Sequence, residues 1–228
     1  MVIAVALITA LVIGTVQGSF FEWAFHRYWL HRPWRPREMF TAHTLIHHQL
    51  CKFDDTFHVV EPEQEEALGF QWWGGPVLIA INVVPWLAAA WALAAAGVAL
   101  PYAAFVIALA ATIALYYAGY EGLHHLMHKP RMPLIENSRY FQFIKRHHRI
   151  HHFEMDRNLN VLLPLADLCL GTLVLEERVP AVTPEAARKL ARRHSDYGTR
   201  LGRPDSIACA AARAAARARA SAALRSEA

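Results

Sequence analysis

Histidine is the residue type whose number and spacing say most about the chemistry of this chain. Ten of its fourteen histidines fall into four short clusters. Imidazole is the commonest neutral metal ligand, and one ion usually takes only three or four protein ligands. Ten imidazoles are too many for one ion and suit two. The clusters are His26 and His31; His43, His47 and His48; His124 and His128; and His148, His151 and His152.

The spacing within the clusters predicts how the imidazoles point. Residues three or four apart share one face of an α-helix. Three clusters contain such spacings, so each is predicted to aim two or three imidazoles at one point, as with the pair His43 and His47. His26 and His31 are five apart, which a regular helix does not align. We therefore expect a local widening of the helix, or a helix end, between them.

Other histidines stand near or apart from the clusters. His125 lies three residues before His128, and His147 lies four before His151, so either is an alternative ligand. His58 and His194 have no clustered partner, so ordinary polar roles are expected for both.

Two acidic residues are candidates to orient the imidazoles. A metal-bound imidazole usually donates its other N–H to a carboxylate or a carbonyl. Glu22 lies four residues before His26, and Glu121 lies three before His124, both in or beside apolar sequence. The competing interpretation for each is a salt bridge to a nearby basic side chain.

The elements that carry the clusters read as membrane-spanning helices. Hydrophobic residues make up 55% of the chain, and charged residues only 18%. Residues 1–25 are almost wholly apolar, and residues 75–119 contain no ionisable side chain except tyrosines. These lengths predict spans at about 1–25, 76–97 and 101–121, with the turn of the hairpin at Gly97 and Pro101. The predicted fold is all-α, an integral membrane protein.

The distribution of charge predicts the side of the membrane. The net charge of +4 alone would allow a nucleic-acid partner, but all 23 basic residues lie within 27–52 and 129–225. This pattern fits the positive-inside rule with both stretches in the cytoplasm, and no nucleic acid is expected. Every histidine cluster is then expected at or beyond a cytoplasmic helix end. The three cysteines form no recognisable pattern.

The remaining sequence divides into a compact part and a tail. Residues 130–180 look compact, and Thr183-Pro184-Glu185 is a typical helix start. An Ala/Arg-rich tail follows, so we expect one domain over 1–204 and the tail over 205–228. A solvated tail is the favoured interpretation, with contact to anionic lipid as the alternative.

The motifs FHRYWLH, HTLIHH, YEGLHHLMH and HHRIHH, in this order with the hairpin between the second and third, resemble the fatty acid hydroxylase/sterol desaturase superfamily. The segment NLNVLLPLADLCLGT resembles the family's ending after its last histidine cluster. The resemblance covers about residues 22–172. It implies a cytosolic helical cap that holds a histidine-ligated di-iron centre, although zinc can replace iron in purified material. It also adds Asn158 and Asn160 as candidates to support the ligands.

The ligands that the resemblance implies are His26, His31, His43, His47, His48, His124, His128, His148, His151 and His152. The implied reaction is O2-dependent oxidation of an unactivated lipid C–H bond, most simply hydroxylation. The HPGG haem motif of members with a fused cytochrome b5 domain does not occur in this sequence. A separate electron carrier, cytochrome b5-like or ferredoxin-like, is therefore expected. The membrane would be the bacterial inner membrane or, in a eukaryote, the endoplasmic reticulum.

Several alternatives remain open on the same residues. A carotenoid ring hydroxylase or a lipid desaturase would use the same metal scaffold. A metal-binding or transport protein would need ligands near the bilayer midplane, where the hairpin has no histidine or acid. A membrane haem protein would need only facing histidine pairs.

Overall fold

Three long helices dominate the computed structural model, which describes residues 1–52, 55–59 and 62–176. They are α1 (Val2–Phe25), α4 (Gly74–Ala95) and α5 (Tyr102–His128). Each is long and apolar enough to cross a membrane, as predicted. Helices α1 and α4 both pack along α5 but hardly on each other. The turn between α4 and α5 contains Gly97 at a φ of 80°, a conformation that glycine adopts without strain.

The third span differs from its predicted length. The apolar sequence predicts an end near residue 121, but α5 continues to His128. The prediction followed the length of apolar sequence, whereas helix geometry persists through Glu121 and the histidines until Lys129 and Pro130. This extension places His124 and His128 on the same rigid element as the span.

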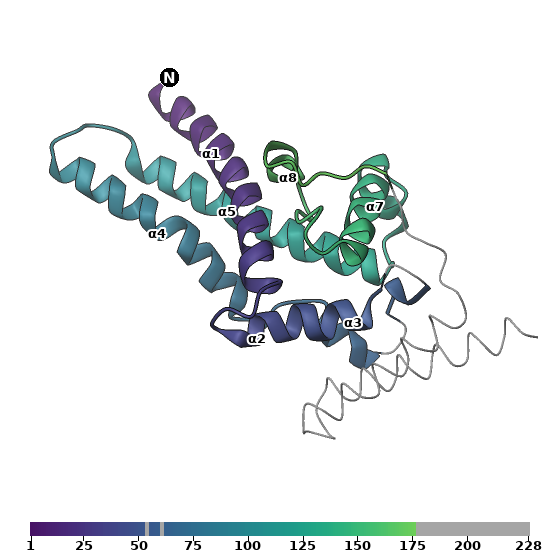
Figure 1. Cartoon of the computed structure of the whole chain (residues 1–228). Helices are drawn as coiled ribbons and strands as arrows, with labels where there is room; N and C mark the ends of the chain where they lie inside the picture. Colours follow the sequence, from purple (N-terminus) through teal and green to yellow (C-terminus); the bar gives the residue numbers. More distant parts are fainter. Residues whose placement is uncertain (53–54, 60–61, 177–228) are drawn as a thin grey trace, which may run out of the picture.

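Short helices connect and cover one end of these three. They are η1 (His26–Leu30), α2 (Arg37–Phe40), η2 (Thr41–His47), α3 (His48–Leu50), η3 (Asp55–Phe57), η4 (Pro62–Ala67), α6 (Pro133–Glu136), α7 (Arg139–Phe153) and α8 (Leu165–Cys169). All regular elements of the described residues are helical. Helices α2, α3 and α7 lie at the end away from the α4–α5 turn (Figure 1).

The surface of the long helices is apolar. Leu11, Trp91, Ile107 and Leu115 are among many large apolar side chains that are more than half exposed. Such a continuous apolar exterior is typical of helices that contact lipid rather than water.

A compact core joins α5 to α7 beside the histidines. Phe141 and Ile144 of α7 pack with Leu126 and Met127 of α5, and all four are buried. Helix α7 begins at Ser138, whose hydroxyl accepts the backbone N–H of Phe141, as an N-cap does. The helix start predicted at residues 183–185, His194, and the domain boundary at 204 with the tail beyond it lie outside the described residues.

Candidate metal centre

The ten clustered histidines come together in two groups of five, and nine of the ten are buried. Within each group, the candidate ligand atoms all lie within 4.8 Å of one another. The first histidine group is His26, His31, His43, His48 and His151, and the second histidine group is His47, His124, His128, His148 and His152.

A widened helix lies where the spacing of His26 and His31 predicts one. Residues His26–Leu30 form a π-helix, and the N–H of His31 donates to the carbonyl of His26 at 3.1 Å. Hydrogen bonds from residue i+5 to residue i bring side chains five apart onto one face. Both imidazoles therefore belong to the first histidine group.

A second π-helix overturns the expectation for His43 and His47. Residues Thr41–His47 form it, and the N–H of His48 donates to the carbonyl of His43. Spacing of five then aligns His43 with His48 in the first histidine group, while His47 turns to the second. The prediction that His43 and His47 share one point is wrong, because it assumed regular α-helical geometry.

Helix α7 also serves both groups. His148 and His152, four apart, lie in the second histidine group, whereas His151 lies in the first. The two groups adjoin, since the rings of His48 and His152 stack with centroids 4.2 Å apart. Adjacent residues of one helix thus supply ligands to two neighbouring points.

Backbone carbonyls orient five of the ten imidazoles. The Nδ1–H groups of His124, His128 and His152 donate to the carbonyls of Leu68, Phe57 and Cys51 at 2.6–2.8 Å. In the first histidine group, His26 donates to Leu159 at 2.5 Å and His151 to Arg157 at 2.8 Å. An imidazole that donates from Nδ1 presents its Nε2 lone pair on the opposite side.

Those Nε2 atoms converge at distances that suit a metal ion. Six Nε2–Nε2 pairs are 2.8–3.3 Å apart. Ligand nitrogens about 2.1 Å from one shared ion, and at right angles to each other, lie about 3.0 Å apart. The donor sets therefore fit a metal ion in each group.

The pair of His31 and His151 makes the need for a cation explicit. The Thr44 hydroxyl donates to the Leu30 carbonyl at 2.6 Å, so it can only accept from Nδ1 of His31, 3.1 Å away. His151 uses its Nδ1–H on the Arg157 carbonyl. Two unprotonated Nε2 atoms then face each other at 3.0 Å. Such facing lone pairs repel unless a cation lies between them.

A proton is a poor candidate for that cation at neutral pH. Burial, the largest cause, and neighbouring imidazoles hold the pKa values of His43, His47 and His48 well below their ordinary range. Burial likewise lowers the pKa of His151 to about 4. Neutral imidazole is the form that coordinates metals.

The alternative ligands His125 and His147 belong to neither group. Nε2 of His125 lies 3.6 Å from a carboxylate oxygen of Glu65. Nε2 of His147 lies 3.1 Å from Oδ2 of Asp167, and both side chains are buried. Among the described residues, each of these two histidines faces a carboxylate and lies outside the histidine groups. His58, expected to stand apart, is exposed and contacts Lys145.

Of the two predicted orienting acids, only Glu22 is connected to an imidazole among the described residues, and it acts through the backbone. The Glu22 carboxylate accepts from the Tyr116 hydroxyl at 2.7 Å, from the Asn160 amide and from the backbone N–H of Val161. It thereby holds the segment that carries the Leu159 carbonyl, the partner of His26. Glu121 has one buried oxygen without a hydrogen-bond partner among the described residues, and His124 bonds to Leu68 instead.

The two predicted asparagines, Asn158 and Asn160, lie in the same segment and fix its backbone by hydrogen bonds. Asn158 has a φ of 51°, and its side chain bonds to the backbone of His147 and Val174. The Asn160 amide donates to the Ser19 carbonyl, and its oxygen accepts from the N–H of Asp167. Both tie the chain after α7 to its neighbours and support the ligands through the backbone.

Asp167 is a buried residue beside the histidine groups that the spacing argument missed. Its carboxylate accepts from the backbone N–H groups of Leu159 and Asn160, the Thr172 hydroxyl and His147. Burial raises the pKa of Asp167, but these hydrogen bonds outweigh burial and lower it. The only sequence signal was its place in the family-like ending.

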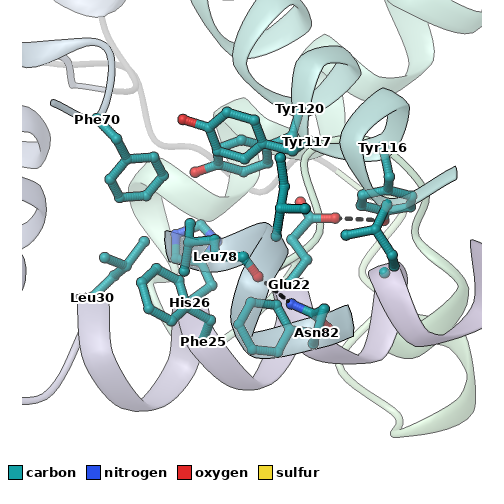
Figure 2. A pocket seen from close by; sticks show the side chains of 14 residues that line it. Glu22, Phe25, His26, Leu30, Phe70, Leu78, Asn82, Tyr116, Tyr117 and Tyr120 are labelled. Carbon is teal, nitrogen blue, oxygen red and sulfur yellow. Dashed lines mark hydrogen bonds between the residues drawn. The ribbon is translucent and has the colours of Figure 1, made fainter. Parts of the chain in front are cut away.

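An apolar pocket reaches the first histidine group from between the long helices. His26 and Leu30 line one end, and Gly18 and Asn82 line the other. The rings of Phe25, Phe70 and Tyr120 gather near His26 (Figure 2). Phe25 and Phe70 are 6.0 Å apart between centroids, and Tyr120 stacks on His124 at 5.9 Å.

Comparisons with known protein families, with curated proteins and with solved structures found no match.

Proposed function

We propose that this chain is an integral-membrane oxygenase that binds two iron ions, one in each histidine group, and oxidises a C–H bond of a lipid. The observation that carries the proposal is the pair of adjoining buried five-histidine groups, one of which borders an apolar pocket. The expected outcome is hydroxylation. One atom of O2 enters the product and the other leaves as water, with a pair of electrons and protons taken up.

Iron in such sites supplies the redox chemistry that activates O2. The residues of this chain supply position and shelter. Backbone carbonyls and Thr44 hold six of the ten imidazoles in place through their Nδ1–H groups. The rings of Phe25, Phe70 and Tyr120 exclude water near His26 and leave an apolar surface for an alkyl group.

The membrane setting supports a lipid substrate. Three helices are apolar enough to span, and their exposed side chains are apolar. A lipid in the same bilayer can enter between α1 and α4 without crossing water. The positive-inside pattern favours the cytoplasm for the histidine end, where a separate cytochrome b5-like or ferredoxin-like carrier would dock.

The test combines metal analysis with isotope-labelled lipidomics. Chain purified from iron-supplemented cells should carry about two iron ions, one per group. Cells that express it under labelled O2, with a competent reductase, should accumulate a lipid carrying the oxygen label. His128→Ala and His151→Ala should remove the labelled lipid and lower iron content, whereas His58→Ala should leave both nearly unchanged.

The outcomes separate the competing functions. An unsaturated product without labelled oxygen identifies a desaturase, and a labelled carotenoid identifies a ring hydroxylase. Bound iron without any oxidised lipid would contradict the oxygenase proposal and leave a metal-binding or transport protein. Absence of bound metal from folded protein would contradict all of these.

A further inference from the structure

The apolar pocket has a well-defined end away from the histidines. On each long helix, the lining residues stop at one level, at Gly18 on α1, Asn82 on α4 and Ile113 on α5. Helices α1 and α4 pack on α5 and hardly on each other, so they form two walls over a common floor. Something must bridge those walls where the pocket stops.

The bridge is a set of side-chain hydrogen bonds between α1 and α4. The Gln17 amide donates to the side-chain Oδ1 of Asn82 at 2.9 Å and to the backbone carbonyl of Asn82 at 3.0 Å. The indole N–H of Trp86 donates to Oε1 of Gln17 at 2.7 Å. Asn82 itself donates to the Leu78 carbonyl, and its side chain is buried. We call Gln17, Asn82 and Trp86 the clasp.

The clasp lies within two of the apolar spans. Polar side chains at this depth are costly to keep and usually mark a functional site. Each polar group of the clasp is paired with another, so little hydrogen-bonding capacity remains for a ligand. The acid that lines the pocket, Glu22, is likewise occupied by Tyr116 (Figure 2). The pocket therefore presents mostly carbon to its contents.

We propose that the clasp is the far wall of the substrate pocket and limits the length of alkyl chain that it accepts. This inference rests on the proposed oxygenase function. Gln17 and His26 are nine residues apart on α1, which corresponds to about 13 Å along the helix. Carbon–carbon bonds of about 1.5 Å zigzag in an extended chain and advance it by about 1.3 Å per carbon, so this length accommodates about ten carbons. The substrate class is a lipid whose chain beyond the oxidised carbon has about this length.

Binding of straight-chain fatty alcohols of graded length to the iron-loaded protein in lipid nanodiscs tests the clasp. Binding to empty nanodiscs is subtracted. When binding is referred to the concentration of free alcohol in water, each additional methylene buried in the pocket should tighten it about fourfold until the chain reaches the clasp, where the gain should stop. In Trp86→Ala and Gln17→Ala, the gain should continue to longer chains. The lipid products in cells should lengthen in parallel.

Two further variants make the test specific. We call the chain length at which the gain in binding stops the break. Trp91→Ala removes the same side-chain type from α4 at a position 74% exposed, and the break should stay at the wild-type chain length. Leu78→Phe narrows the pocket on the histidine side of Asn82, so the break should move to shorter chains. A break that stays put in both clasp variants and in Leu78→Phe, or that moves equally in Trp91→Ala, overturns the proposal.

The binding readout keeps this inference separable from the proposed function. A break that moves as described, without any oxidised lipid, supports the clasp and contradicts the oxygenase. Oxidised lipid with an unmoved break in folded clasp variants supports the oxygenase and contradicts the clasp as the limit on chain length.

Discussion

Replacement of Asp167 by Asn tests whether the chain after α7 positions the metal ligands. The carboxylate accepts two hydrogen bonds on each oxygen, from Leu159 and Thr172 on Oδ1 and from Asn160 and His147 on Oδ2. An amide keeps the shape but turns one acceptor into a donor, so whichever way it points, one backbone N–H, of Leu159 or of Asn160, loses its acceptor and faces another N–H.

The expected loss of stability is large for an isosteric change. A buried hydrogen bond to a charged group contributes about 1.5–3 kcal/mol, and the variant loses one such bond outright. For a chain of this size, 1 kcal/mol shifts the midpoint by about 2–4 °C, so the melting temperature should fall by about 3–12 °C. Thermal unfolding of the detergent-solubilised protein measures this. Asp156→Asn is the matched control, because Asp156 is exposed.

The same change should weaken one histidine group selectively. Asp167 holds the backbone of Leu159, whose carbonyl accepts Nδ1–H of His26 in the first histidine group. Loss of such an orienting partner typically lowers metal affinity about 10–100-fold. Titration with an iron chelator should therefore show one weakened ion and one unchanged. A melting temperature within about 2 °C of wild type, together with unchanged iron affinity, would refute this reasoning.

Three shorter predictions address single contacts. His31→Ala should remove about one iron ion per chain by elemental analysis, because it deletes a ligand of one group only, whereas His58→Ala should remove none. Thr44→Val should weaken iron binding because Nδ1 of His31 loses its acceptor, whereas Thr44→Ser keeps a hydroxyl and should bind iron as the wild type does. Equal iron affinity in the two variants would contradict this role of Thr44. Gly18→Ala should lower the melting temperature, since its Cβ would lie 2.7 Å from the Tyr116 ring. Gly122→Ala, with open space around it, should leave the melting temperature unchanged or raise it, because alanine stabilises a helix by about 1 kcal/mol relative to glycine.

The helices and the ligand candidates were largely predictable from local sequence. The three apolar stretches predicted α1, α4 and α5 because helix formation in a span depends on composition over neighbouring residues. The irregular spacing of His26 and His31 predicted a widened helix or a helix end, and η1 is the widened helix. The second widening, η2, was not predicted, because His43 and His47 already fit a regular α-helix.

Other features of the site depend on contacts between distant segments. The clasp joins Gln17 and Asn82, which are 65 residues apart, and a lone amide in each span gives no periodic signal. The carbonyls that orient His26 and His152 lie 133 and 101 residues away. A backbone carbonyl has no residue type, so no sequence pattern can mark it.

The sequence by itself determined that ten histidines would stand at or beyond the ends of apolar helices, because residue type and local spacing are properties of short segments. Only the tertiary structure decided that His47 and His48, neighbours in the chain, serve different groups, and that α7 divides its histidines between both. The physical reason is geometric. Convergence of Nε2 atoms from four separate segments depends on the packing of α1, α5 and α7 and on helix widenings of one residue, which spacing alone does not specify.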